Sequence, residues 1–126
     1  MLINFETQKS VQEVRTALEE KAKAKGFGVM AVHEVSNILK NKGVPIDYEC
    51  VIVEVCSPRH ASQVLSKNAF ISTAMPCRIA IFQKDGKTVV STMAPTAMLE
   101  MFQEPQLKDV AEEVERLMKE IIQESI

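Results

Sequence analysis

The sequence has no tryptophan, one tyrosine and only three cysteines among its 126 residues. The cysteine count is odd and no Cys-x-x-Cys pair occurs, so neither a disulfide framework nor a paired zinc motif is expected. Cys50 and Cys56 are six residues apart in an apolar run, which on a strand separates them by about 20 Å. A disulfide needs Cα atoms within about 7 Å, so this pair cannot close. We therefore expect reduced thiols and a cytoplasmic location.

The chain also lacks an excess of charge of one sign, a long apolar run and the common cofactor motifs. Fifteen Lys and Arg stand against seventeen Asp and Glu, a net charge of −2 that argues against a nucleic-acid partner. No run approaches the ~20 apolar residues of a membrane span, and the first residues do not resemble an export signal, so no membrane partner is expected. Gly-rich phosphate loops, His-Glu-x-x-His and Gly-x-Ser-x-Gly are absent, so we assign no cofactor, no metal and no catalytic residue.

What is present is a globular composition, 46% hydrophobic and 25% charged, in a chain of one ordinary domain's length. We treat residues 1–126 as a single domain. Strands are expected near residues 2–5, 27–33, 48–56, 77–83 and 88–93, and helices near 11–25, 35–41, from 58 onward, from 95 to 104 and 107–122. The order β-α-β-α-β-α-β-β-α-α predicts an α/β (α+β) fold, with a mixed sheet of about five strands covered by helices.

Two local patterns support this assignment most strongly. Ser10 and Glu13 form a capping box, in which each side chain bonds the free backbone N–H of the other, before a run with helical apolar spacing. In the segment Cys50–Cys56 the odd and the even positions, which point to opposite faces of a strand, are all apolar except Glu54. This pattern predicts an interior strand buried on both faces. The helix that follows predicts a right-handed crossover to a parallel strand, which would leave Cys56 and Cys77 a full strand length apart.

The most distinctive candidate site is the junction Cys56-Ser57-Pro58-Arg59, where the interior strand ends and a helix begins. Crevices form at such strand ends, and the free N–H groups of a helix start favour an anion. Arg59 adds positive charge, and a helix start lowers the pKa of a nearby thiol such as Cys56. The alternative interpretation is an ordinary capped helix beside a buried cysteine, because every helix start offers the same N–H groups.

Other chemical groups have simpler structural interpretations. Glu54 is alone in its apolar run and needs a partner, for which Arg78 is the natural candidate. His33 and His60 have no spacing that joins them to a cysteine or to each other. Methionine sulfurs with Cys77 would suit a copper(I) site, but methionines more often form an apolar contact surface, which is the stronger interpretation. We expect Met98, Met101 and Phe102 to form such a surface in a homodimer.

Four segments, taken together and in this order, resemble a bacterial and archaeal family, the domain-of-unknown-function family numbered 302. They are Cys56-Ser57-Pro58, Met75-Pro76-Cys77-Arg78-Ile79, the run from Ser91 to Leu99, and Val110-Ala111-Glu112-Glu113-Val114. The resemblance implies a compact α/β domain of this size and a dimer, and it carries over no catalytic residue. The Cys-x-Pro and Pro-Cys of the family pattern are matched, but Ser57 stands where asparagine is frequent. His33-Glu34 likewise replaces an acidic pair.

We hypothesise a dimeric domain that binds a small anionic ligand beside Cys56, Ser57, Arg59, Cys77 and Arg78. A second hypothesis is a thiol-dependent enzyme in which Cys56 or Cys77 is activated by the helix start or by His33. It requires a thiolate that titrates well below about 8.5. A third hypothesis is a structural or protein-interaction module with the Met-rich helix as its contact surface.

Overall fold

The fold centres on a five-stranded sheet in which every neighbouring pair of strands is antiparallel. The computed structural model describes residues 1–126. The strand order is β1-β5-β4-β3-β2. The strands are β1 (Leu2–Thr7), β2 (Gly28–His33), β3 (Cys50–Cys56), β4 (Cys77–Lys84) and β5 (Lys87–Met93). The helices are α1 (Val11–Ala24), α2 (Val35–Asn41), α3 (Pro58–Lys67), α4 (Pro95–Glu100) and α5 (Lys108–Ser125), with 3-10 turns η1 (Ala69–Ala74) and η2 (Pro105–Leu107). The expected α+β class, with five strands and packed helices, is confirmed.

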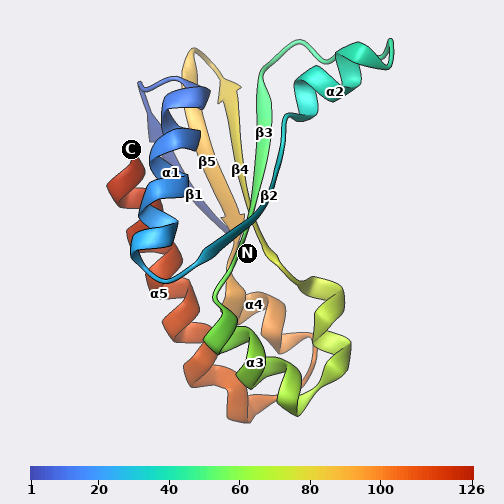
Figure 1. Cartoon of the computed structure of the whole chain (residues 1–126), viewed down its shortest axis with the longest axis vertical. Coiled ribbons are helices and arrows are strands. Elements are labelled where there is room, and N and C mark those ends of the chain that lie inside the picture. The colour runs from blue at the N-terminus through green and yellow to red at the C-terminus, as the bar shows by residue number, and fades with distance from the viewer.

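The expected parallel pairing of β3 with β4 is wrong. In the structure Val55 lies opposite Cys77, so the end of β3 and the beginning of β4 share one end of the sheet. The reason is the path of the connection, since α3 and η1 lie beyond the end of the sheet rather than across its face (Figure 1). The right-handed crossover rule applies only to a connection that packs on the sheet. Cys56 and Cys77 are therefore neighbours in the fold, not a strand length apart.

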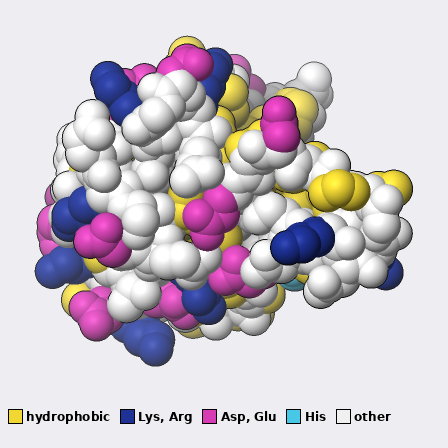
Figure 2. Space-filling view, turned by 90° about the horizontal axis from the view of Figure 1, so that it is seen from above, with side chains coloured by type: hydrophobic (Ala, Val, Ile, Leu, Met, Phe, Trp, Pro, Cys, Tyr) yellow, Lys and Arg dark blue, Asp and Glu magenta, His cyan; other side chains and the backbone are white.

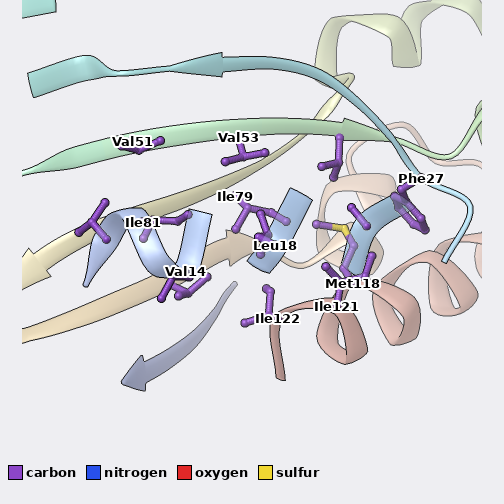
Figure 3. Packing of buried hydrophobic residues seen from close by; sticks show 14 residues of the cluster. Val14, Leu18, Phe27, Val51, Val53, Ile79, Ile81, Met118, Ile121 and Ile122 are labelled. Atoms are coloured by element: carbon purple, nitrogen blue, oxygen red, sulfur yellow. The ribbon is translucent and has the colours of Figure 1, made fainter. Parts of the chain in front are cut away.

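One face of the sheet packs against α1 and α5. The capping box at the start of α1 is present, with Glu13 N donating to Ser10 Oγ at 3.1 Å and Ser10 N donating to Glu13 Oε1 at 3.0 Å. Apolar side chains recur along α1 at helical spacing and meet those of the central strands and of α5 (Figure 3). The core residues that have no exposed surface include Val14, Leu18, Val53, Ile79, Ile81, Val90, Met118, Ile121 and Ile122.

The other face of the sheet is only partly covered, which corrects the expectation that β3 is buried on both faces. β3 is an interior strand between β4 and β2, but only its alternate residues, such as Val53, are fully buried. The apolar residues of β3 that point to the second face of the sheet are only partly buried. Glu54 projects there and contacts Arg78 Nε at 3.4 Å and His33 Nε2 at 3.5 Å. The ion pair between Glu54 and Arg78 that the sequence predicts is therefore present.

Residues between β2 and β3 form an arm that extends from the sheet at the end remote from α3 (Figure 1). Its helix α2 has no buried residue, and Val44 beyond it is 61% exposed. The arm is held by Ser36, whose Oγ accepts from Cys50 N at 3.1 Å. Acidic and basic side chains are interspersed over this end of the molecule (Figure 2). None of the helices has the length and apolar character that crossing a bilayer requires.

Candidate functional site

A partly open pocket lies where β3 ends and β4 begins, among α3, η1, α4 and α5. Its volume is about 90 Å³, and fifteen of the nineteen residues that line it are hydrophobic. Representative apolar lining residues are Phe27, Val64, Ile71, Met98, Leu99 and Phe102. An apolar pocket with a few convergent polar groups is the usual form of a small-molecule site.

The elements around the pocket are fixed by ordinary local signals. Pro58 occupies the first turn of α3, where its missing N–H is not needed and its φ is already helical. Asn68 ends α3 and starts η1, because its side chain accepts a hydrogen bond from Phe70 N at 2.9 Å. These residues turn the chain sharply away from the sheet and back again, which leaves the pocket between the two segments.

Helix α4, which forms another wall of the pocket, is anchored to α5 by one carboxylate. Glu115 Oε1 accepts hydrogen bonds from Thr96 Oγ1 at 2.7 Å and from Thr96 N at 3.3 Å. It thus supplies, from another helix, the cap that Ala94 at the N-cap position of α4 cannot provide. Burial opposes ionisation of Glu115, but the hydrogen bonds from Thr96 and the charge of Lys119 prevail and lower its pKa. α4 is therefore held by a charged acceptor.

Two polar side chains at the start of α3, Ser57 and His60, line the pocket, and His60 also contacts Glu113 of α5, which lies outside the lining. Ser57 is the N-cap residue of α3, yet its side chain does not cap the helix. Its Oγ lies instead 2.6 Å from Nδ1 of His60, a residue that is only 4% exposed. The other ring nitrogen, Nε2, is 3.0 Å from Glu113 Oε2. This second contact is an ion-pair approach outside good hydrogen-bond geometry, and it leaves Nε2 buried without a well-directed acceptor.

The charge on Glu113 is supported by its neighbours. The contact with His60 lowers the pKa of Glu113, and the positive charges of Arg59 and Arg116 act in the same direction. Glu113 is therefore a carboxylate at neutral pH, with one oxygen facing His60 and the other 3.5 Å from the Arg59 guanidinium. No pattern in the sequence links this residue of α5 to the start of α3.

The five residues expected to bind a ligand divide into two groups. Cys56, Ser57 and Cys77 line the pocket. Arg59 and Arg78 do not: the Arg59 side chain is 74% exposed beside Glu113, and that of Arg78 is 60% exposed beside Glu54. The walls that remain are apolar, so the pocket lacks the arginine charges that the sequence suggested for an anion site.

Sequence reasoning missed His60 and Glu113. A signal for His60 existed, because Ser57 and His60 occupy the N-cap and third positions of a proline-started helix, where side chains meet. Glu113 had no comparable signal, since only the tertiary packing of α5 brings it to α3. Met98, Met101 and Phe102 were expected to form an exposed contact surface. Met98 and Phe102 instead line the pocket, whereas the Met101 side chain is 69% exposed.

The three cysteines are free thiols. Burial raises the pKa of Cys50 and of Cys56. Burial, with a smaller effect of Cys56, raises the pKa of Cys77 to about 11. These directions are opposite to the low pKa that a reactive thiolate needs. No group of three His, Cys, Asp or Glu side chains is placed to hold a metal ion.

Comparison with known proteins places the fold among relatives of unassigned activity. The sequence model described as "Domain of unknown function DUF302" matches residues 3–125. The structure is similar to the crystal structure of an uncharacterized conserved DUF302 protein from Bacillus stearothermophilus, with a TM-score of 0.94 and 29% sequence identity. That similarity covers 99% of this chain and 98% of the other. No curated protein matches the chain.

Proposed function

Since the chain belongs to the DUF302 family, whose description assigns no function, we propose from the pocket itself that the domain binds a small ligand. The ligand has an apolar body and one polar or acidic head group. The body lies among the apolar side chains of α3, α4 and η1, and the head group meets Ser57 and His60. The observation that supports this most directly is the buried Ser57–His60 pair within otherwise apolar walls.

The size of the pocket limits the ligand. An engineered apolar cavity of about 150 Å³ holds benzene. A pocket of about 90 Å³ accordingly accepts an apolar group of roughly four non-hydrogen atoms, such as a short acyl chain. Larger ligands would have to extend through the open side.

The head group has donors available even though the two arginines lie outside. The first-turn N–H groups of a helix have no acceptor within that helix, and the Ser57 side chain does not occupy those of α3. The His60 ring and the Ser57 hydroxyl add two groups that donate or accept. A carboxylate or ester carbonyl matches these donors, which retains an acidic head group but removes Arg59 and Arg78 from its binding.

Binding of butyrate, measured by isothermal titration calorimetry, tests this proposal. Val64 lines the pocket, whereas the adjacent Leu65 is 39% exposed and does not. Val64→Phe should fill the pocket and abolish butyrate binding, while Leu65→Phe, the matched control, should bind as the unmodified protein does. Thermal unfolding of both variants checks that they are folded. Equal binding by both variants, or no heat of binding to the unmodified protein, would contradict the proposal.

We propose separately that two copies of the chain associate through the less covered face of the sheet. Leu2 and Met93 are paired across β1 and β5 and are 60% and 50% exposed. We take this pair as the centre of the contact, because contiguous exposed apolar surface marks sites of interaction. Met93→Lys should shift the mass in solution, measured by light scattering, from dimer to monomer. Met101→Lys, at an exposed methionine directly after α4, should leave the mass unchanged. A monomeric unmodified protein would refute this.

A further inference from the structure

The three side chains Ser57, His60 and Glu113 form a series in which a hydroxyl faces an imidazole and the imidazole faces a carboxylate. The distances are 2.6 Å from Ser57 Oγ to His60 Nδ1 and 3.0 Å from His60 Nε2 to Glu113 Oε2. A nucleophile within reach of a base, with that base oriented by a third group, is the arrangement of covalent acyl transfer. The first two side chains also line the apolar pocket.

The negative charge of Glu113 favours one tautomer of His60. Glu113 is ionised at neutral pH, because its contact with His60 and the nearby arginines lower its pKa. A neutral imidazole carries its proton on one ring nitrogen, and a proton on Nε2 faces the negative charge of Glu113 Oε2 at 3.0 Å. In that tautomer Nδ1 carries no proton and can accept the hydrogen bond of the Ser57 hydroxyl, which lies 2.6 Å away. This is the tautomer in which His60 can remove the hydroxyl proton of Ser57.

The position of Ser57 is unusual for a residue that only starts a helix. An N-cap serine normally accepts a hydrogen bond from a backbone N–H of the first turn, as Ser10 does for Glu13. Ser57 makes no such bond, and its hydroxyl is hydrogen-bonded to His60 instead. The first-turn N–H groups of α3 therefore stay available to stabilise negative charge that develops on a carbonyl oxygen.

We propose that Ser57 is a nucleophile that accepts the acyl group of short-chain carboxylic esters and passes it to water. This rests on the proposed function, because the acyl chain occupies the same pocket. His60 is the general base and acid. Glu113 is a positioning residue, since its negative charge lies 3.0 Å from His60 Nε2 and favours the proton on that nitrogen.

The reaction balances with water as the second substrate. Ser57 Oγ forms a bond to the acyl carbon while its proton moves to His60 Nδ1. The bond from the acyl carbon to the ester oxygen then breaks, and that oxygen leaves with the electron pair and takes the proton from His60. Water attacks the acyl-Ser57 ester, His60 removes its proton, and that proton returns to Ser57 Oγ as the carboxylic acid departs.

The test is the reaction of the full chain with 4-nitrophenyl butyrate, followed by absorbance of released nitrophenolate and by intact mass with peptide mapping. The unmodified chain should release nitrophenolate and carry a butyryl group on Ser57. Ser57→Ala should lower release by on the order of 100-fold. Ser66→Ala, at an exposed serine on the same helix, should react as the unmodified chain does.

Glu113→Gln separates a positioning role from a structural one. It should lower the acylation rate by on the order of 100-fold while the affinity for butyrate is kept. Equal loss of rate and affinity would assign Glu113 a structural role only and overturn this part of the proposal. Methanesulfonyl fluoride, which needs no variant, should sulfonylate the unmodified chain at Ser57.

The outcomes distinguish the nucleophile from the pocket. If the chain binds butyrate but neither reagent modifies Ser57, the nucleophile is refuted and the binding proposal stands. If the chain neither binds butyrate nor reacts, both proposals are wrong. An acyl group found on Cys56 or on a lysine, or release by Ser57→Ala equal to that of the unmodified chain, would also overturn the assignment of Ser57.

Discussion

Val55 on β3 and Cys77 on β4 lie directly opposite one another in an antiparallel register. This pairing makes the chain leave and re-enter the sheet at the same end. α3 and η1, which connect the two strands, therefore stay beyond that end and face α4 and α5 (Figure 1). The pocket exists because these four segments meet there around apolar side chains.

Ser57→Ala should destabilise the fold by about 1–3 kcal/mol, because it leaves Nδ1 of the buried His60 without a partner. Loss of a helix cap does not contribute, since Ser57 does not cap α3. Urea unfolding followed by circular dichroism measures the change. Ser62→Ala, at an exposed position of α3, is the control and should change stability by less than about 0.5 kcal/mol. Equal stabilities of the two variants would show that the Ser57–His60 contact contributes nothing.

The buried thiol of Cys77 should make the fold less stable at alkaline pH. Its pKa is raised from an ordinary 9.0 to about 11 in the folded protein. Between these values the unfolded chain releases the proton while the folded chain keeps it, so stability falls as pH rises. The loss attributable to Cys77 is on the order of 2 kcal/mol.

Urea unfolding at a series of pH values from 8 to 11 measures this loss, and Cys77→Ala should flatten the dependence. Cys50→Ala is the matched control, because the Cys50 thiol is less buried and its pKa is raised less strongly. A slope unchanged by Cys77→Ala would contradict the assignment.

Adjacent residues of β4 should differ widely in their contributions to stability. Ile79 has no exposed surface and packs in the core, so Ile79→Ala should cost about 2–5 kcal/mol. Arg78 is largely exposed, and its ion pair with Glu54 is worth at most about 1 kcal/mol. Urea midpoints of Ile79→Ala and Arg78→Ala compare them. A larger loss for Arg78→Ala would mean that the less covered face of the sheet is buried, as it would be in a tight dimer.

Much of the fold could be predicted from the sequence because its signals are local. The capping box of Ser10 and Glu13 and the apolar spacing that follows indicate α1 without tertiary information. The position of β3 inside the sheet follows from its continuous apolar run, and the lone Glu54 required a partner, which is Arg78. The antiparallel pairing of β3 with β4 could not be predicted in this way. The sequence does not specify whether the helix after β3 packs on the sheet or beyond its end.

The candidate site was predictable only in part, for the same reason. The strand end and helix start at Cys56 and Ser57 are local features, and both residues line the pocket. The direction of the Arg59 side chain depends on Glu113, and the burial of His60 depends on α5, so both require tertiary packing. Local sequence therefore located the pocket but not its polar partners.

The anchor between α4 and α5 should control the mobility of the pocket wall. Thr96→Val keeps the shape of the side chain but removes the hydroxyl that donates to Glu115. We expect a loss of about 1–2 kcal/mol and faster hydrogen exchange of the α4 amides, because a charged acceptor loses a donor. Thr73→Val, on exposed η1, is the control. Unchanged exchange in α4 would show that the anchor is dispensable.

The measurement that tests the pocket most directly is a methyl NMR spectrum of methionine-labelled protein during a titration with butyrate. Met98 and Met75 line the pocket, whereas Met101 and Met30 are exposed elsewhere. Ligand in the pocket should shift the methyl signals of Met98 and Met75 in a saturable manner and leave those of Met101 and Met30 in place. Saturable shifts confined to Met101 or Met30, or none at Met98 at any butyrate concentration, would contradict the account.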